Sequence, residues 1–245
     1  MRVTWASSTA FATVGTAVVT LLLLPLLNIA YDVLLGADLS APDLVRTGYA
    51  AALVALASSV CAGVVGTVAT DRNLGVFQEV HMRRRIDPAY WLAVAVVPAL
   101  LAVLTGAAAI GAVFLLSPGH DSAMLLRVIA FAPIAVVCGL LLGVSAAGIG
   151  VDLPDPYLGA TIVSTFLPLL TGVIVPLSVC PGWLRILAGF APVSGTVTAL
   201  DAATGDIAPM LVHDLLVALV WSAVGLVATR HAITRLRAGL RRDVV

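Results

Sequence analysis

Long apolar runs that are almost free of charge dominate this chain and constrain what it can fold into. Of its 245 residues, 61% are hydrophobic and 11% are charged, whereas an ordinary soluble domain has about 25% charged residues. So few charges cannot coat a surface that faces water. The chain is therefore predicted to be an integral membrane protein whose solvent is largely lipid.

Six apolar segments are long enough to cross a hydrocarbon core of about 30 Å at a helical rise of about 1.5 Å per residue. An all-α protein with six transmembrane helices is therefore predicted. The spans are expected at about 10–29, 47–70, 91–116, 128–151, 157–179 and 209–229. The last is the least uniform, because His213 and Asp214 stand in its expected first turns.

The stretch between the fifth and sixth spans differs from the others. Its uncharged middle, 186–200, is too short to cross a membrane and is interrupted by Pro192 and Gly195. We predict a re-entrant hairpin at about 183–205. It should pack on the helices, so that protein rather than lipid covers its backbone polar groups.

The arginines set the expected orientation, because basic residues in short loops are retained on the cytoplasmic side. With both termini inside, ten arginines fall on the cytoplasmic side: Arg2, Arg72, Arg83, Arg84, Arg85, Arg230, Arg235, Arg237, Arg241 and Arg242. Three fall outside: Arg46, Arg127 and Arg185. The turn 152–156 is placed inside although it holds two Asp and no Arg. The net charge of +0 leaves no global basic surface for nucleic acid.

The polar segment Asp71–Pro88 separates the second span from the third. Asp71 can cap a helix there. Apolar residues then recur at helical spacing: Leu74, Phe77 and Val80 or His81. The pattern predicts an amphipathic helix parallel to the membrane. Two interpretations stay open, an electrostatic anchor in which the 83–85 arginines meet anionic headgroups and a docking surface for a soluble partner.

Cysteines and small residues in the apolar runs are interpreted as packing. Cys61 and Cys138 lie within apolar runs and Cys180 lies near the end of another, with no spacing typical of disulfides or metal sites. Gly139 and Gly143 form a G-x-x-x-G pattern, which we expect to pack helices within one chain rather than between two copies.

No motif in the sequence supports catalysis. The chain lacks a phosphate-binding loop, an H-E-x-x-H zinc motif and a G-x-S-x-G nucleophile elbow. His213 and Asp214 are candidates because ionisable residues near a membrane span are often functional. A solvated helix start that reaches interfacial water is the favoured interpretation of this pair.

Two stretches carry a resemblance to a known family. The first is the loop after the second span, through Arg72, Gly75, Glu79 and Pro88. The second begins at the end of the fifth span and continues beyond it, through Gly172, Pro176, Pro181, Trp183, Leu184, Pro192 and Gly205. Together with the hydropathy profile they resemble the membrane subunits of bacterial ABC exporters of the type-2 permease family, which includes drug, polysaccharide and lipid exporters. Two departures concern the subfamily: 1–9 is short for an interfacial helix, and Asp201 stands where a basic residue is often found.

The resemblance implies a half-transporter in the bacterial plasma membrane. Two such permease subunits, identical or paralogous, would pair with each other and with two ATPase subunits that bind ATP and Mg²⁺, so this chain itself would hold no cofactor. The cargo would be amphiphilic or hydrophobic, such as a drug, lipid, peptide or glycan-lipid.

The resemblance also assigns roles to particular residues. A coupling helix within Asp71–Pro88 would contact the ATPase through Leu74, Phe77, Gln78, Glu79, His81 and Arg83. Polar positions near the path would be Ser58, Ser59, Thr67, Thr161, Ser164, Thr165 and Thr171. For any one of these hydroxyls, a bond back to its own helix is the favoured alternative.

Two rival classes remain. One is a membrane-embedded enzyme that uses His213 or Asp214. The other is a non-catalytic membrane assembly or immunity protein that only binds a partner. Co-purification of an ATPase subunit would favour the exporter, turnover without any partner would favour the enzyme, and partner binding unaffected by nucleotide would favour the third.

Overall fold

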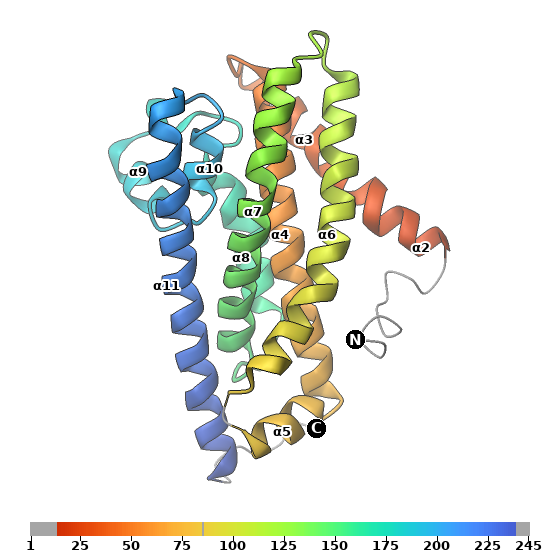
Figure 1. The fold of residues 1–245 in the computed structure, drawn as a ribbon, viewed down its shortest axis with the longest axis vertical. Coiled ribbons are helices and arrows are strands. Elements are labelled where there is room, and N and C mark those ends of the chain that lie inside the picture. The colour runs from red at the N-terminus through yellow and green to blue at the C-terminus, as the bar shows by residue number, and fades with distance from the viewer. Residues whose placement is uncertain (1–13, 85, 239–245) are drawn as a thin grey trace.

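The computed structural model describes residues 14–84 and 86–238, and every regular element in these ranges is helical (Figure 1). In chain order these elements are α2 (Val14–Val18), the π-helix η2 (Val19–Leu23), α3 (Leu24–Asp38), α4 (Leu44–Asn73), α5 (Val76–Arg83), α6 (Pro88–Leu116), α7 (Ser122–Gly150), α8 (Leu158–Thr171), the 3₁₀ helix η3 (Leu177–Val179), α9 (Gly182–Ala188), α10 (Ser194–Thr198) and α11 (Thr204–Arg237).

Four described helices are long and apolar enough to cross a membrane: α4, α6, α7 and α11. They correspond to the second, third, fourth and sixth predicted spans. Aspartates start three of them, since Asp43, Asp87 and Asp121 accept hydrogen bonds from backbone N–H groups in the first turns of α4, α6 and α7. Each cap begins its helix a few residues before the apolar run, so these helices are longer than predicted.

The first and fifth predicted spans differ from the helices observed. In place of a span at 10–29, helix runs without a break from Val14 to Asp38, and residues 10–13 lie outside the described residues. The predicted helix at 157–179 is wrong beyond Thr171, because Gly172 adopts a positive φ of 70° and ends α8. The 14 residues of α8 span about 21 Å, less than the about 30 Å of a hydrocarbon core.

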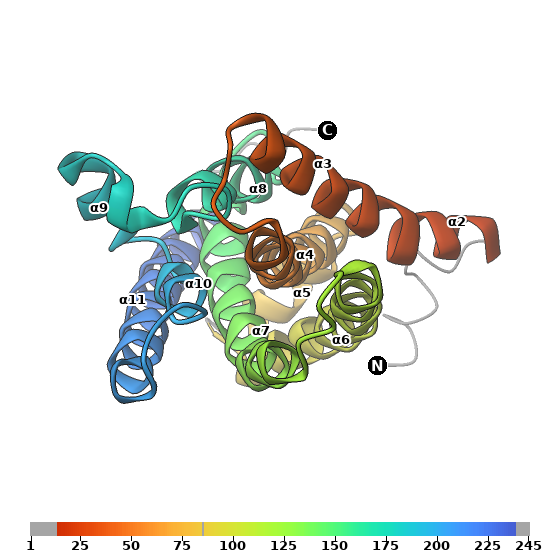
Figure 2. The same ribbon diagram turned by 90° about the horizontal axis from the view of Figure 1, so that it is seen from above.

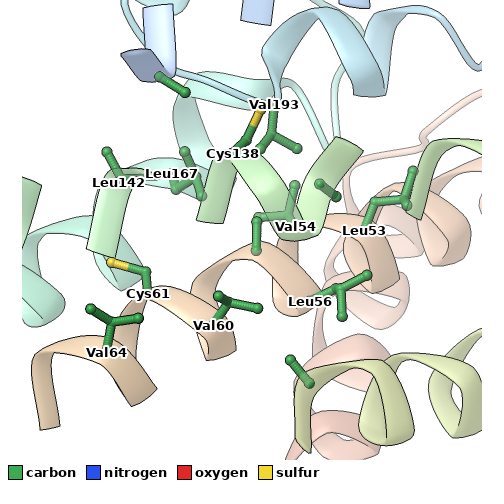
Figure 3. Packing of buried hydrophobic residues seen from close by; sticks show 14 of the residues in the cluster. Leu53, Val54, Leu56, Val60, Cys61, Val64, Cys138, Leu142, Leu167 and Val193 are labelled. Atoms are coloured by element: carbon green, nitrogen blue, oxygen red, sulfur yellow. The ribbon is translucent and has the colours of Figure 1, made fainter. Parts of the chain in front are cut away.

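Helix α4 forms the centre of the bundle, with α3, α6, α7 and α8 around it (Figure 2). Its contact with α7 is close because glycines replace larger side chains. A Cβ on Gly139 would lie 2.9 Å from the Ala57 Cα, and one on Gly143 would lie 3.1 Å from the Cys61 Cα. The G-x-x-x-G pattern therefore packs α7 on α4 of the same chain, as predicted. Figure 3 shows the apolar core at this contact, including Cys61, Cys138 and Leu142.

Helix α11 packs along α7 and extends to both ends of the bundle (Figure 1). Near one end lies the segment 172–203 with its short helices η3, α9 and α10, which we call the hairpin. Near the other end of α11 lies α5. The two segments that do not span the bundle thus occupy opposite ends of one long helix.

Candidate functional sites at the two ends of the bundle

The predicted helix at 71–88 is two elements rather than one. Helix α4 continues to Asn73, so Asp71 is not a cap: its Oδ2 accepts a hydrogen bond from the Tyr90 hydroxyl at 3.0 Å. Gly75 then adopts a φ of +77° that turns the chain sharply into α5. Helix α5 ends at Arg83, Arg84 is extended, and Arg85 lies outside the described residues.

One face of α5 is buried against its own chain. Phe77 is 1% exposed and His81 is 0% exposed. Their rings stack at a centroid distance of 4.1 Å, and Tyr90 of α6 meets both edge-on. The predicted stripe holds for these two residues, whereas Leu74 is 70% exposed and lies off it. Phe77 therefore seats α5 on the bundle, and in this conformation its ring is not available to a partner.

His81 sits in this aromatic seat without a full set of hydrogen bonds. Its Nδ1 lies 2.9 Å from the Phe77 carbonyl oxygen, while its Nε2 is buried with no partner among the described residues. Burial lowers the pKa of His81 below its ordinary value of 6.5 and outweighs the Phe77 carbonyl and Asp87, which raise it, while the charge of Arg237 adds a smaller lowering. The seat thus holds a neutral imidazole.

Three arginines near α5 bind backbone carbonyls or a carboxylate of neighbouring segments. Arg237 of α11 donates from Nη2 to the carbonyls of His81 at 2.7 Å and Met82 at 2.9 Å. Arg72 donates to the Leu153 carbonyl at 2.7 Å, and Arg235 pairs with Asp152 at 2.8 Å. The turn 152–156 therefore lies at the α5 end, where neighbouring helices supply the arginines that it lacks.

The outer face of α5 mixes charged and apolar side chains. Glu79 and Arg83 pair at 3.1 Å with side chains 74% and 79% exposed, and such exposed pairs contribute little stability. Met82 is also exposed. Gln78 lies between the two faces, donating from Nε2 to the Arg72 carbonyl at 3.2 Å. This outer face is the part of α5 that a partner can reach.

At the opposite end, two arginines hold the hairpin through its backbone. Arg46 of α4 is 4% exposed. Its Nε lies 2.6 Å from Oδ2 of Asp201, and its Nη1 donates to the carbonyls of Gly172 and Val173. Arg127 of α7 donates to the carbonyls of Leu200 and Ala202. From the sequence, these two arginines predicted only the orientation. Two features could have indicated their role: each is a charge beside a span, and the segment they bind is interrupted by Gly and Pro.

Asp214 supplies the third attachment. It is 0% exposed and accepts from the Gly195 N–H at 2.9 Å, the Thr196 N–H at 2.6 Å and the Thr196 hydroxyl at 2.7 Å. Because α11 begins at Thr204, Asp214 and His213 stand in its third turn, not its first. The solvated helix start is therefore wrong for Asp214, while the neighbouring His213 has a 53% exposed side chain.

The seven predicted path hydroxyls do not converge on one surface. Six donate to carbonyls of their own helices: Ser59, Thr67, Thr161, Ser164, Thr165 and Thr171. Ser58 differs, because its hydroxyl is buried with no partner among the described residues. Only Thr161, Ser164 and Thr165 share a face, which is exposed on α8. The described residues contain no cluster of His, Cys, Asp or Glu that could hold a metal ion.

The geometry defines a membrane protein with a helix seated at one end and a hairpin fastened at the other. Residues 2–204 match the ABC-2 type transporter family. The chain therefore belongs to this family of membrane transport components, which pair with an ATPase subunit. Searches of curated proteins and of solved structures each found no match.

Proposed function

We propose that this chain is the permease subunit of an ATP-driven exporter in a bacterial plasma membrane, paired with a second permease subunit and two ATPase subunits. The family match and the resemblance of its loop and hairpin motifs to those of exporters support the direction. The α5 end is cytoplasmic in this proposal. The observation that carries it is the division of α5 into a face seated on the bundle and a face left open.

The open face of α5 is the proposed contact with the ATPase. Glu79 and Arg83 of α5, together with Leu74 at the end of α4 beside it, are exposed and lie where a soluble subunit can bind them. Phe77 and His81 contribute to this contact indirectly, because they hold α5 against the bundle. Gln78 joins α5 to the end of α4. ATP-driven movement of the ATPase would push on α5 and through it on the helices that carry the cargo. The proposed ATP and Mg²⁺ sites belong to the partner.

The test is co-purification of the ATPase from the native host, comparing Leu74→Ala and Glu79→Ala with the wild type at equal expression. We expect both variants to retain their fold and to recover less ATPase, because exposed interface residues can be truncated without disturbing the core. Asp206→Ala, which changes an exposed residue in the first turn of α11 at the hairpin end, is the matched control. Normal ATPase recovery and transport in both α5 variants would contradict the proposal.

The orientation has its own test. Cys61 and Cys138 are fully buried, whereas Cys180 in the hairpin is partly exposed and unpaired. An impermeant maleimide should therefore label Cys180 in intact cells if the hairpin end is extracytoplasmic. Labelling that needs lysis would reverse the orientation.

The cargo path remains part of the proposal. Thr161, Ser164 and Thr165 give α8 an exposed polar face within an apolar helix, and the cargo class we propose is an amphiphile that such a face can pass along. The enzyme alternative is less well supported, because the Asp214 carboxylate is closed off by its three hydrogen bonds. An immunity or assembly protein would show partner binding unaffected by nucleotide.

A further inference from the structure

A hollow of about 360 Å³ opens between α9, α10 and the start of α11. Its walls carry two basic side chains, Arg185 and His213, and two residues with hydroxyls, Ser194 and Thr198. Apolar residues complete much of the lining: Leu177, Ala188, Pro209 and Met210. Among the residues that the structure describes, none of those lining the hollow is acidic. The wall therefore offers positive charge beside hydrocarbon.

Arg185 is the feature of this hollow that the fold does not use. The other two arginines at the hairpin end are occupied, since Arg46 and Arg127 bind hairpin carbonyls. Arg185 has no acceptor for its guanidinium among the described residues, and it is exposed. A planar guanidinium with its donors open matches the geometry of a phosphate or carboxylate group.

The nearest carboxylate does not open into the hollow. Asp214 lies beside it, with one oxygen 3.9 Å from Nδ1 of His213. Its oxygens are directed at Gly195 and Thr196, and the side chain has no exposed surface. An anion in the hollow would thus meet the Arg185 and His213 side chains while the Asp214 charge stays covered.

The outer surface of the hairpin indicates what kind of anion can arrive. Five large apolar side chains in and beside α9 are exposed: Val179, Trp183, Ile186, Leu187 and Phe190. Exposed Trp and Ile beside an arginine are typical of a segment at the boundary between acyl chains and headgroups. In Figure 2, α9 projects beyond the helices at the edge of the bundle, where lipid can reach it.

We infer that this hollow binds the acidic headgroup of an amphiphile, a phosphate or carboxylate joined to a hydrocarbon chain. Arg185 provides a two-pronged contact to the anion, His213 provides a second donor, and the Met210 side of the wall receives the first part of the chain. The source is either a phospholipid of the bilayer or a free amphiphile. The inference does not depend on the proposed ATPase partner.

The test uses the purified full-length chain in a neutral detergent, with native mass spectrometry to titrate phosphatidylglycerol and, in parallel, phosphatidylcholine of the same acyl chains. The wild type should bind phosphatidylglycerol more tightly. Arg185→Gln should weaken this binding about tenfold, as expected for the loss of a charge-assisted hydrogen bond. His213→Gln should weaken it less, and Arg185→Lys should retain part of it.

The control is Arg230→Gln, which removes another exposed arginine with no acceptor among the described residues, at the far end of α11. Its phosphatidylglycerol affinity should equal that of the wild type. Displacement of the lipid by dodecyl phosphate would identify a free amphiphile as an accepted ligand, and retention of the lipid would identify the bilayer as the source. Equal affinity for the two lipids, or equal losses in Arg230→Gln and Arg185→Gln, would overturn the inference.

Discussion

The two ends of the bundle hold their non-spanning segments in different ways. At the hairpin end, Arg46, Arg127 and Asp214 bind backbone groups that have no helical partner. At the other end, Phe77 and His81 hold α5 by packing, and Arg237 binds carbonyls only in its last turn. Because a buried backbone group must be paired, the hairpin depends on its ionisable neighbours for its own conformation. Helix α5 forms its own helical bonds and depends on the packing of Phe77 and His81 chiefly for its position.

The largest expected effect comes from Asp214→Ala. The substitution leaves two N–H groups and one hydroxyl buried without an acceptor, at about 1–3 kcal/mol each, so a loss of about 4 kcal/mol is expected. The measurement is thermal unfolding in detergent. Asp206→Ala, which removes an exposed acid from the first turn of the same helix, is the control and should stay within about 0.5 kcal/mol of the wild type. Similar stability in both variants would mean that Asp214 does not hold the hairpin.

Arg46 and Asp201 separate the role of the backbone bonds from that of the ion pair. Arg46→Met removes all three contacts of a buried guanidinium and should cost about 3 kcal/mol, whereas Asp201→Asn alters a carboxylate that is 52% exposed and should cost about 1 kcal/mol or less. Maleimide labelling of Cys180 should therefore accelerate in Arg46→Met and change little in Asp201→Asn. Equal acceleration would assign the fastening to the ion pair alone.

Phe77→Ala tests the seat of α5. The loss should be about 2 kcal/mol, below the about 3–5 kcal/mol typical of a buried Phe→Ala change, because a peripheral helix can settle into the space. Leu74→Ala, on the exposed side, should leave stability within about 0.5 kcal/mol. The measurement is the hydrogen-exchange rate of the α5 amides in Phe77→Ala compared with the same amides in the wild type. Faster exchange throughout the hairpin as well would show that the two ends are not held independently.

The smallest effect concerns pH. Because burial lowers the pKa of His81 below 6.5, the unfolded or unseated state binds a proton more readily than the seated one. Seating is therefore fully favourable above pH 6.5 and weakens as the pH falls from there toward the lowered pKa. Hydrogen exchange of α5 at pH 7.5 and pH 5.5 should show loosening at the acid value. His81→Phe should remove this dependence, and a wild type that does not respond would refute it.

Much of the spanning architecture could be predicted from local sequence. Apolar runs located α4, α6, α7 and α11, because a helix that faces lipid must be composed mainly of apolar residues. The end of α8 could not be located this way. Glycine is common in membrane helices, and what ends this one is the left-handed turn at Gly172, whose carbonyl is bound by Arg46 at a separation of 126 residues.

The functional residues likewise divide into those that local spacing could place and those that it could not. Helical spacing correctly put Phe77 and His81 on one face, but spacing cannot say whether that face meets a partner or the chain's own α6. The pair of Arg46 and Asp201 is separated by 155 residues, so neither position alone indicates the other. Periodicity predicts which residues share a face of a helix, but it does not identify the distant residues that this face contacts.

The length of α11 has a mechanical consequence. Asp214 binds α10 and Arg237 binds α5. The two residues stand on the same helix, about 35 Å apart at about 1.5 Å per residue. No proline interrupts that stretch, and its one glycine, Gly225, is pressed against Ser145 of α7. The segment is thus a single unbroken helix that joins the two ends of the bundle. In the proposed exporter, a displacement of α5 would reach the hairpin through this one unbroken helix.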